Sequence, residues 1–271
     1  MKHANPTGRA VPSLQEVRRM LADPHCDPTL VDRLRDDPRA TVASLLDVAE
    51  RRGRRLAEET ARHREMLAIE RELEASGRFL IAGVDEAGMG PLAGPIVAAA
   101  VILGDAARIQ GIDDSKKLDE NKRTRLAGEI REQAIGVSIG IATVAEIDEL
   151  NVYHAGLLAM RRAVEGLVRK PDYVLVDARR IPDIGIAQSA YVRGDSRSLS
   201  IAAASIVAKT HRDALMYEFD RVHPGYGFSR HKGYGTPEHQ AALRRLGISS
   251  IHRSSYDAVR ELVAAGRRQD D

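Results

Sequence analysis

The chain has 271 residues, 43% of them hydrophobic and 30% charged, so it can form one large globular domain, alone or with a smaller appendage. Because 41 Lys and Arg nearly balance 39 Asp and Glu, the net charge of +2 excludes anion binding through total charge alone, and an anionic partner would need a local basic patch. A single cysteine, Cys26, excludes an internal disulfide and a multi-cysteine zinc site; with no secretory signal pattern and no bilayer-length apolar run, we expect a cytoplasmic protein without membrane association.

Residues 1–76 have the composition of a helical segment, because they are rich in Arg, Glu, Asp and Ala and contain almost no strand-like run. Ser13 followed by Glu16 is a capping-box pattern that predicts a helix start. From Thr41 onward, apolar residues recur at helical spacing up to a stop at Gly77. We therefore predict a helical N-terminal extension over residues 1–76.

The arginine cluster at residues 51–55 leaves two interpretations of this extension. It could contact a polyanion, or the extension could be a packing and solubilising appendage. Acidic residues interleave with the arginines, which favours the second interpretation.

From residue 78 the pattern changes to alternating strands and helices, which predicts an α/β fold with a mixed sheet flanked by helices and a helical C-terminal part. We place this domain at residues 77–266 and a short tail at 267–271. The predicted strands are 79–84, 96–103, 137–142, 173–176 and 187–192; the predicted helices are 120–133, 147–168, 198–219, 237–246 and 256–265.

A glycine-rich loop at residues 88–95 follows the first of these strands. Such a loop could cradle a cofactor phosphate or allow another molecule to approach the backbone closely. A dinucleotide-binding turn requires a helix after the loop, but the β-branched residues after Pro95 predict a strand, and no Gly-Lys-Ser/Thr follows for a phosphate loop of the Walker type. Close approach of another molecule, or simply a tight loop, is the better interpretation.

Three aspartates follow buried strands: Asp85, Asp177 and Asp195. Singly, each could be a turn residue or helix cap. Together, carboxylates at the ends of neighbouring strands would repel one another unless cations lay between them. An all-oxygen ligand set suits Mg²⁺ or Mn²⁺, and two such ions suggest phosphodiester hydrolysis.

Six motifs occur in a recognisable order: DEAGMGPLAGP at 85–95, DSKKL at 114–118, VD at 176–177, GD at 194–195, AASIVAK at 203–209 with RD at 212–213, and HKGYGT at 231–236. From about Phe79 to Tyr256 the chain resembles the bacterial ribonuclease HII family, the type 2 ribonucleases H. Residues 1–76 lie outside the resemblance, although some members carry a similar helical extension.

The resemblance implies a ribonuclease H-like fold and hydrolysis of the phosphodiester 5′ to a ribonucleotide, leaving 3′-hydroxyl and 5′-phosphate ends. It also implies that Asp85, Glu86, Asp177 and Asp195 are both the catalytic residues and the ligands of two Mg²⁺ or Mn²⁺ ions. Since strand alternation would place Asp85 and Glu86 on opposite faces, we expect Glu86 to lie already in the turn.

The implied partner is an RNA/DNA hybrid, or duplex DNA containing ribonucleotides, bound by a monomer that removes misincorporated ribonucleotides and RNA primers. The resemblance assigns substrate contacts to the glycine loop and to Tyr234, which would sense the 2′-hydroxyl. Lys116 and Lys117 are placed to contact phosphates, although a solvated surface pair is the usual fate of adjacent lysines. His231, His252 and Arg253 are expected on the same surface.

Met89 departs from the family pattern, whose loop usually reads Gly-Arg-Gly. Backbone contacts from Gly88 and Gly90 survive the change, but a charge-assisted phosphate hydrogen bond, worth about 1.5–3 kcal/mol, does not. We therefore expect cleavage to persist, with weaker binding or less preference for a single ribonucleotide.

Two other readings remain open at this point. A nuclease of the same fold could act mainly on long hybrids or on DNA structures, and a non-catalytic module could keep the fold to bind nucleic acid. Tyr234 and the glycine loop favour ribonucleotide sensing over the first. Four intact acids argue against the second, because carboxylates facing phosphates weaken binding unless metal is present.

Overall fold

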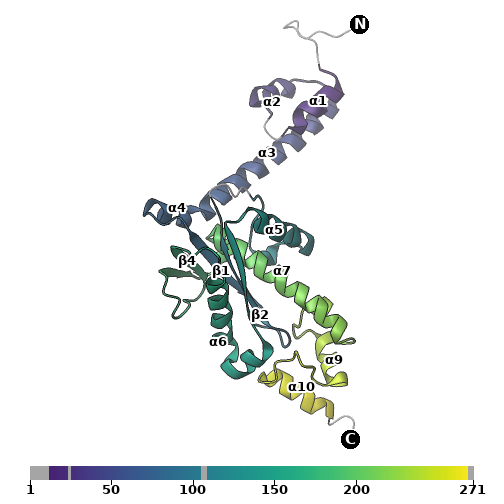
Figure 1. The fold of residues 1–271 in the computed structure, drawn as a ribbon. Coiled ribbons are helices and arrows are strands. Elements are labelled where there is room, and N and C mark those ends of the chain that lie inside the picture. The colour runs from purple at the N-terminus through teal and green to yellow at the C-terminus, as the bar shows by residue number, and fades with distance from the viewer. Residues whose placement is uncertain (1–11, 24–25, 105–108, 268–271) are drawn as a thin grey trace. The chain divides into compact units, whose positions relative to one another are not determined.

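The structure, a computed structural model, describes residues 12–23, 26–104 and 109–267, which form two compact units with a division after Arg64 (Figure 1). This division places α4 (Ala68–Ala75) in the second unit by its packing. The domain boundary that the sequence predicts at residue 76 stays a prediction. The remaining helices are α1 (Leu14–Ala22), α2 (Pro28–Arg35), α3 (Ala40–Met66), α5 (Glu120–Gln133), α6 (Val144–Glu165), α7 (Leu199–Val222), α8 (Phe228–His231), α9 (Pro237–Leu246) and α10 (Asp257–Arg267), with 3₁₀ turns η1 (Ser115–Lys117) and η2 (Gly194–Ser196).

The first unit has a small core of its own, formed by α1, α2 and the first part of α3. Ser13 and Glu16 form the predicted capping box at the start of α1. The core side chains are Val17, Leu21, Leu34, Val42 and Leu46. In the arginine cluster, Arg51 pairs with Asp47 at 2.6 Å and Arg52 donates to the carbonyl of Leu21. These contacts within the unit favour the packing interpretation of the extension.

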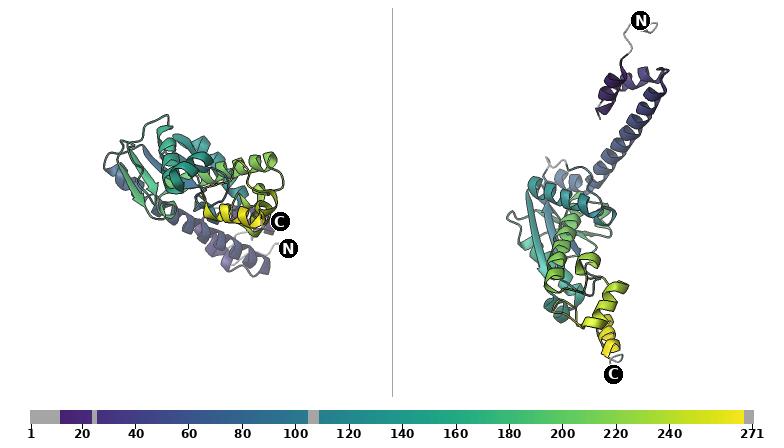
Figure 2. Two further views of the ribbon diagram at one scale, coloured as in Figure 1. Left: turned by 90° about the horizontal axis from the view of Figure 1, so that it is seen from below. Right: turned by 90° about the vertical axis from the view of Figure 1, so that its right-hand side faces the viewer.

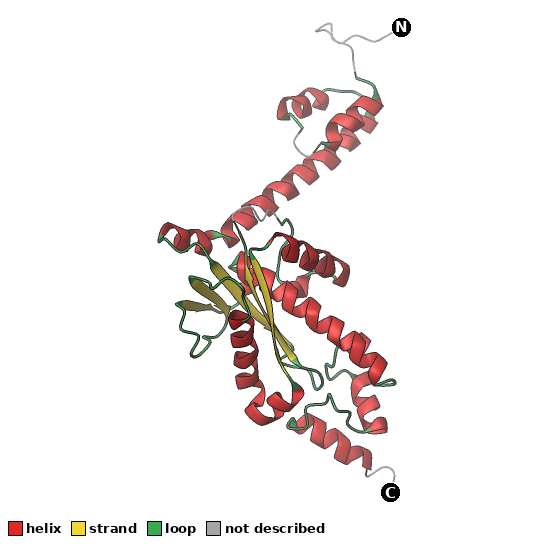
Figure 3. Ribbon diagram, viewed as in Figure 1, coloured by secondary structure: helices red, strands yellow, loops and turns green. Residues whose placement is uncertain are grey.

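The second unit is built on one five-stranded sheet with the order β3-β2-β1-β4-β5 (Figure 3). β2 (Ile96–Ile102) runs antiparallel to both of its neighbours, β1 (Ile81–Ala87) and β3 (Gly136–Ala142). β4 (Tyr173–Asp177) runs parallel to β1, and β5 (Gln188–Tyr191) runs parallel to β4. The sheet is therefore mixed, as predicted.

Helices cover both faces of this sheet, and the two faces carry different cores. α6 packs on one face, against even-numbered β1 residues such as Val84, while α5 and α7 cover the other (Figure 1). Gly83 allows α7 to approach closely, since a Cβ there would lie 2.0 Å from the carbonyl carbon of Ser200. Buried β2 is flanked on both faces, which explains its continuous run of small and branched apolar residues.

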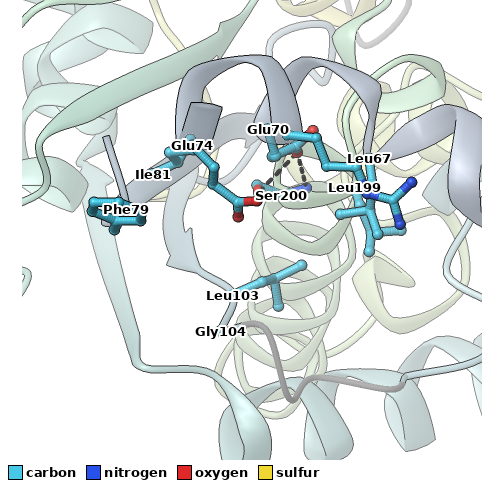
Figure 4. A pocket seen from close by; sticks show the side chains of 10 residues that line it. Leu67, Glu70, Glu74, Phe79, Ile81, Leu103, Gly104, Leu199 and Ser200 are labelled. Carbon is cyan, nitrogen blue, oxygen red and sulfur yellow. Dashed lines mark hydrogen bonds between the residues drawn. The ribbon is translucent and has the colours of Figure 1, made fainter. Parts of the chain in front are cut away.

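α4 is anchored on the second unit by a buried carboxylate. Oε1 of Glu70 accepts hydrogen bonds from the hydroxyl of Ser200 at 2.9 Å and from its amide at 3.0 Å (Figure 4). It also accepts from the hydroxyl of Ser198 at 2.6 Å, and these bonds cap the N-terminus of α7. A cavity of about 130 Å³ lies beside this cap. It contains none of the four predicted acids and is far too small for a duplex, so the candidate site must lie elsewhere.

The helical C-terminal part closes the far end of the unit. α9 and α10 pack against each other beyond the end of α7 (Figure 2, right). Thr236 caps α9, with Pro237 at its first position, so the helix predicted at 237–246 is found with those bounds. Among the described residues, we find no helix with the length and apolarity needed to cross a bilayer.

Candidate active site

Two aspartates meet at the carboxyl ends of the central strands. The parallel register of β1 and β4 sets Val84 opposite Val176, so the next residues, Asp85 and Asp177, lie level on neighbouring strands. Residues level in a parallel pair point to the same face, and here that face carries α7. The predicted pair is thus brought together by strand register.

Glu86 lies inside β1, paired with Ala98, so the prediction that it lies in the turn is wrong. The strand continues because antiparallel pairing with β2 extends to Ala87. Its side chain therefore leaves on the face opposite Asp85, where Arg179 approaches Oε1 at 3.4 Å. Oε2 of Glu86 is buried and has no hydrogen-bond partner in the described structure.

Asp195 reaches the same end of the sheet from η2, after a left-handed residue, Arg193 (φ 56°). Asp177 helps to hold this turn, because its Oδ1 accepts a hydrogen bond of 2.7 Å from the amide of Gly194. We refer to Asp85, Glu86, Asp177 and Asp195 as the acidic cluster.

Burial and neighbouring negative charges raise the pKa values of three acids of the cluster, Asp85, Glu86 and Asp195. Burial, and then the charges of Glu86 and Asp177, raise the pKa of Asp85 well above its ordinary value. Burial raises the pKa of Glu86 to about 7; Asp177 adds to the rise while Arg179 opposes it. The pKa of Asp195 is raised by burial and by Asp114 and Asp177. Negative charge here is costly unless a cation compensates it.

The donor chemistry of the acidic cluster fits a divalent cation. All donors are carboxylate oxygens, which Mg²⁺ and Mn²⁺ prefer, and Oε2 of Glu86 is an unpartnered buried oxygen. Within the described part of the chain, no three acidic, histidine or cysteine side chains already stand in metal-binding geometry. The carboxylates turn instead to local donors, as Asp85 does to the Glu86 amide at 2.7 Å. Small side-chain rotations would therefore accompany binding.

Two buried serines support Asp85 and were not selected as site residues from the sequence. Ser205 on α7 hydrogen-bonds the Asp85 carboxylate, which lowers its pKa against the larger opposing effect of burial. The Ser205 hydroxyl lies 2.9 Å from that of Ser115 in η1. This chain ties the loop carrying Lys116 and Lys117 to the acidic cluster. The sequence feature that could have identified Ser205 is a single serine within the apolar run 201–208.

Lys116 and Lys117 are both exposed in η1, but they differ in surroundings. The charge of Lys116 lowers the pKa values of Glu86 and Asp195, so it lies near the acidic cluster. Lys117 lies 3.4 Å from a carboxylate oxygen of Asp113. Their assignment as phosphate contacts stays a prediction, with Lys116 better placed.

Two fully buried arginines fix the glycine loop, and we call them the arginine clamp. Arg253 donates to the carbonyls of Gly88, Met89 and Gly94. Arg212 donates to the carbonyls of Ala93, Pro95 and Lys232 at 3.0–3.2 Å. The clamp packs tightly on Gly88 (φ 102°), where a Cβ would lie 2.3 Å from Nε of Arg212. Glycine is therefore required by conformation and by space.

Tyr234 lies beside this loop, 44% exposed, and a Cβ on Gly90 would be 3.8 Å from its ring. Its carbonyl is held by two buried histidines. Because the Ser249 amide donates to Nδ1 of His252, Nε2 of His252 donates to Nε2 of His239 at 3.0 Å, and Nδ1 of His239 donates to the Tyr234 carbonyl at 2.9 Å. Burial lowers the pKa of His252 to about 4, which keeps this chain neutral.

The expectation that His231, His252 and Arg253 lie on the same surface as the lysines is wrong, because all three side chains are buried. Their donors and acceptors are used inside the protein; for example, Nδ1 of His231 accepts from the Gly233 amide at 3.2 Å. They position the loops around Tyr234.

Met89 is half-buried and packs against the core beneath α6. A Cβ on Gly156 would lie 2.9 Å from its Sδ, so glycine at that position makes room for it. The side chain of Met89 thus contacts α6, while Gly90 beside it is exposed.

A mixed five-stranded sheet between helices, with carboxylates at the ends of its central strands and an exposed tyrosine beside a fixed glycine loop, defines a nuclease of the ribonuclease H type. The sequence profile of Ribonuclease HII matches residues 82–259, and that of the Ribonuclease HII N-terminal domain matches residues 13–74. The chain belongs to the ribonuclease HII family and is an endoribonuclease. Enzymes of this kind are metal-dependent.

Curated relatives are similar over most of the chain. Ribonuclease HII of Myxococcus xanthus is 52% identical over 235 residues, covering 86% of this chain and 80% of the relative. That of Anaeromyxobacter sp. is 47% identical over 265 residues, covering 96% and 83%.

Solved structures share the fold. Ribonuclease H2 from Pyrococcus horikoshii matches with a TM-score of 0.61 and 25% identity, over 69% of this chain and 99% of that one. Ribonuclease HII from Archaeoglobus fulgidus, solved in complex with PCNA, matches with a TM-score of 0.58 and 27% identity, over 68% and 96%. The predicted ribonuclease H-like fold is confirmed.

Proposed function

We propose that the chain hydrolyses the phosphodiester on the 5′ side of ribonucleotides, in RNA/DNA hybrids and at single ribonucleotides embedded in duplex DNA. The products would carry 3′-hydroxyl and 5′-phosphate ends. The observation that carries this proposal is the level placement of Asp85 and Asp177 on adjacent strands, where burial and the charges of Glu86 and Asp177 raise the pKa of Asp85. Such a cluster is suited to cations and to a phosphodiester that brings its own charge.

In this proposal Asp85, Glu86, Asp177 and Asp195 hold two Mg²⁺ or Mn²⁺ ions, and Ser205 orients Asp85 for that task. When bound, such ions supply Lewis-acid stabilisation of the phosphate oxygens and an activated water. The carboxylates must be ionised for binding, so the raised pKa of Glu86 makes cation affinity increase with pH up to about 7.

Substrate selection is proposed to lie in the loops around the acidic cluster. Exposed Gly90 lets the nucleic-acid backbone approach, and Tyr234 beside it packs against the ribose that carries the 2′-hydroxyl. Gly88 and Met89 contribute backbone groups of the same loop, and Lys116 and Lys117 contact flanking phosphates. The arginine clamp keeps the loop in place during binding.

The cellular role that follows is removal of misincorporated ribonucleotides and of RNA primers during DNA replication, by a monomer. The helical extension at residues 1–76 is proposed to act mainly as a packing appendage, since its arginines pair within the first unit.

Cleavage of three end-labelled duplexes tests the proposal: one with a single ribonucleotide, one with a continuous RNA strand and one of DNA only. Each is incubated with Mg²⁺, Mn²⁺ or chelator. We expect metal-dependent cleavage 5′ to the single ribonucleotide and none of the DNA duplex. Cutting of the continuous hybrid alone would remove single-ribonucleotide recognition from the proposal, and equal cutting of all three would refute ribonucleotide sensing by Tyr234.

A further inference from the structure

Arg179 lies next to the acidic cluster without belonging to any motif selected from the sequence. Its guanidinium nitrogen is 3.4 Å from Oε1 of Glu86, and the side chains are 26% and 11% exposed. A tight guanidinium–carboxylate pair has distances of about 2.7–2.9 Å, so this pair is loose. Arg179 therefore contacts a predicted metal ligand without being locked to it.

The backbone directs Arg179 to Glu86 through a left-handed residue. Asp177 faces α7, and continued strand alternation would send Arg179 to that same face. Instead Ala178 adopts φ 55°, a conformation that disfavours residues with a Cβ, and the chain turns so that Arg179 meets the α6 face. The Ala178 amide, bonded to the Tyr191 carbonyl at 2.9 Å, holds this turn.

α6 provides a seat for the guanidinium. Asn151 (φ 69°) interrupts α6, and its side chain accepts from the amide of Tyr153 at 2.9 Å, which restarts the helix there. The ring of Tyr153 lies 5.3 Å from Cζ of Arg179, in cation–π geometry. A Cβ on Gly156 would lie 3.6 Å from Nη1 of Arg179, so the guanidinium is in van der Waals reach of the helix.

We propose that Arg179 exchanges partners when substrate binds: it pairs with Glu86 in the metal-free protein and turns to a phosphate oxygen of the nucleic acid once a divalent cation occupies Glu86. The inference rests on the function proposed above. A cation at Glu86 neutralises the carboxylate and repels the guanidinium, whose donors then need another anion. Tyr153 keeps the released side chain near the site, and the anion that arrives there is the phosphate backbone.

A permanent ion pair between Arg179 and Glu86 is the competing interpretation, and it differs in its consequences. In the exchange, Arg179 and the cation compete for Glu86, so removing the arginine must strengthen cation binding. Arg179 also contributes one phosphate contact, so its removal must weaken duplex binding. A permanent structural pair would also let removal of the positive charge strengthen cation binding, but it requires no loss of duplex affinity, so the duplex measurement separates the two interpretations.

The first test measures Mn²⁺ binding by calorimetry in the full chain without nucleic acid. R179Q is expected to bind Mn²⁺ severalfold more tightly than the parent protein. R179K, which keeps the charge but not the planar fork, should lie between them. The matched control is R180Q, because Arg180 is the exposed neighbour on the same loop, and it should leave the affinity unchanged.

The second test measures binding of a labelled duplex with one ribonucleotide by fluorescence anisotropy in Ca²⁺, over a series of salt concentrations. R179Q should bind about tenfold more weakly, and the slope of log affinity against log salt should fall by about 0.9, the value for one phosphate contact. In chelator the loss should be smaller, because Arg179 is then paired with Glu86.

The proposal requires both shifts, and it is overturned if R179Q matches R180Q in either Mn²⁺ affinity or salt slope. Thermal unfolding of each variant checks that the fold is intact, and R179K serves if R179Q does not fold. Failure of the proposed function would appear differently, as a parent protein that does not cleave the ribonucleotide duplex while the competition for Glu86 is still measured.

Discussion

The acidic cluster and the arginine clamp lie side by side at one end of the same sheet, yet they are built in opposite ways. In the clamp, Arg212 and Arg253 are fully buried and their donors meet loop carbonyls. In the acidic cluster, burial and like charge raise pKa values, and Oε2 of Glu86 has no partner.

The difference separates rigidity from function. Satisfied hydrogen bonds in the clamp hold the glycine loop and Tyr234 in one arrangement, which prepares the substrate surface. Buried carboxylates close to one another destabilise the fold locally, and that cost is recovered when cations bind. Variants of the two regions should therefore change different observables.

The largest expected effect is on turnover. Asp85→Asn removes a charged cation ligand, and we expect cleavage of the single-ribonucleotide duplex to fall by about 10³-fold or more, since metal ions supply several kcal/mol of charge stabilisation. Duplex binding should persist. Asp257→Asn, at an exposed aspartate of α10, is the matched control. Turnover within tenfold of the parent would show that Asp85 does not hold a catalytic cation.

Breaking the clamp should change stability instead. Arg253→Met leaves carbonyls of the loop without donors, and we expect a loss on the order of 4 kcal/mol in the free energy of unfolding, measured with urea. Arg125→Met is the control, because Arg125 is an exposed helical residue paired with Glu129, worth roughly 0.5 kcal/mol. A loss below about 1 kcal/mol for Arg253→Met would contradict the clamp.

Removing one acid should stabilise the chelated protein, in contrast to removing a clamp residue. The pKa of Glu86 is raised by burial to about 7 from an ordinary value of 4.5, so the folded state holds this proton more tightly than the unfolded state. The free energy of unfolding is therefore unaffected by this group below pH 4.5. It falls by roughly 3 kcal/mol as the pH rises from 4.5 to 7, because Glu86 then loses its proton in the buried site.

In chelator, Glu86→Gln should match the parent near pH 4.5 and exceed its free energy of unfolding by roughly 3 kcal/mol above pH 7. Glu129→Gln, a control at a partly exposed helical residue outside the acidic cluster, should show no such divergence. Parallel pH profiles for Glu86→Gln and the parent would indicate that Glu86 is not under electrostatic strain.

The smallest expected effect concerns Met89, between the two regions. Met89→Arg adds a cation to the loop, and we expect duplex affinity to rise by up to about tenfold, with a salt slope steeper by about 0.9. The gain is limited because the arginine must leave the packing that Met89 makes with α6. Unchanged affinity, salt dependence and preference for a single ribonucleotide would refute the expectation drawn from the loop sequence.

The sequence predicted the acidic cluster better than its surroundings. Asp85 and Asp177 follow apolar runs, and strand ends in parallel register bring such residues together. The sequence suggests that Arg253 and His252 lie at the surface, because charged and polar side chains are rarely buried. Both are buried, and the reason is visible only in three dimensions: the loop carbonyls accept from Arg253, and His239 pairs with His252.

The fold shows the same limit. The sheet and the long helices follow from periodicity, with boundaries shifted by a few residues. Pairing with β2 extends β1 beyond Glu86. Asn151 adopts a left-handed conformation that interrupts α6, and hydrophobic periodicity does not predict such an interruption. Arg179 was missed for the same reason, since the turn at Ala178 sets its direction.

Thermal unfolding during a Mn²⁺ titration tests most directly whether the acidic cluster is a strained site relieved by cations. The unfolding temperature of the parent should rise with Mn²⁺ according to binding by mass action, whereas Asp177→Asn should start from a higher temperature in chelator and gain much less from the metal. If Mn²⁺ stabilises Asp177→Asn as much as the parent, the ions bind elsewhere and the assignment of the acidic cluster as the metal site is contradicted.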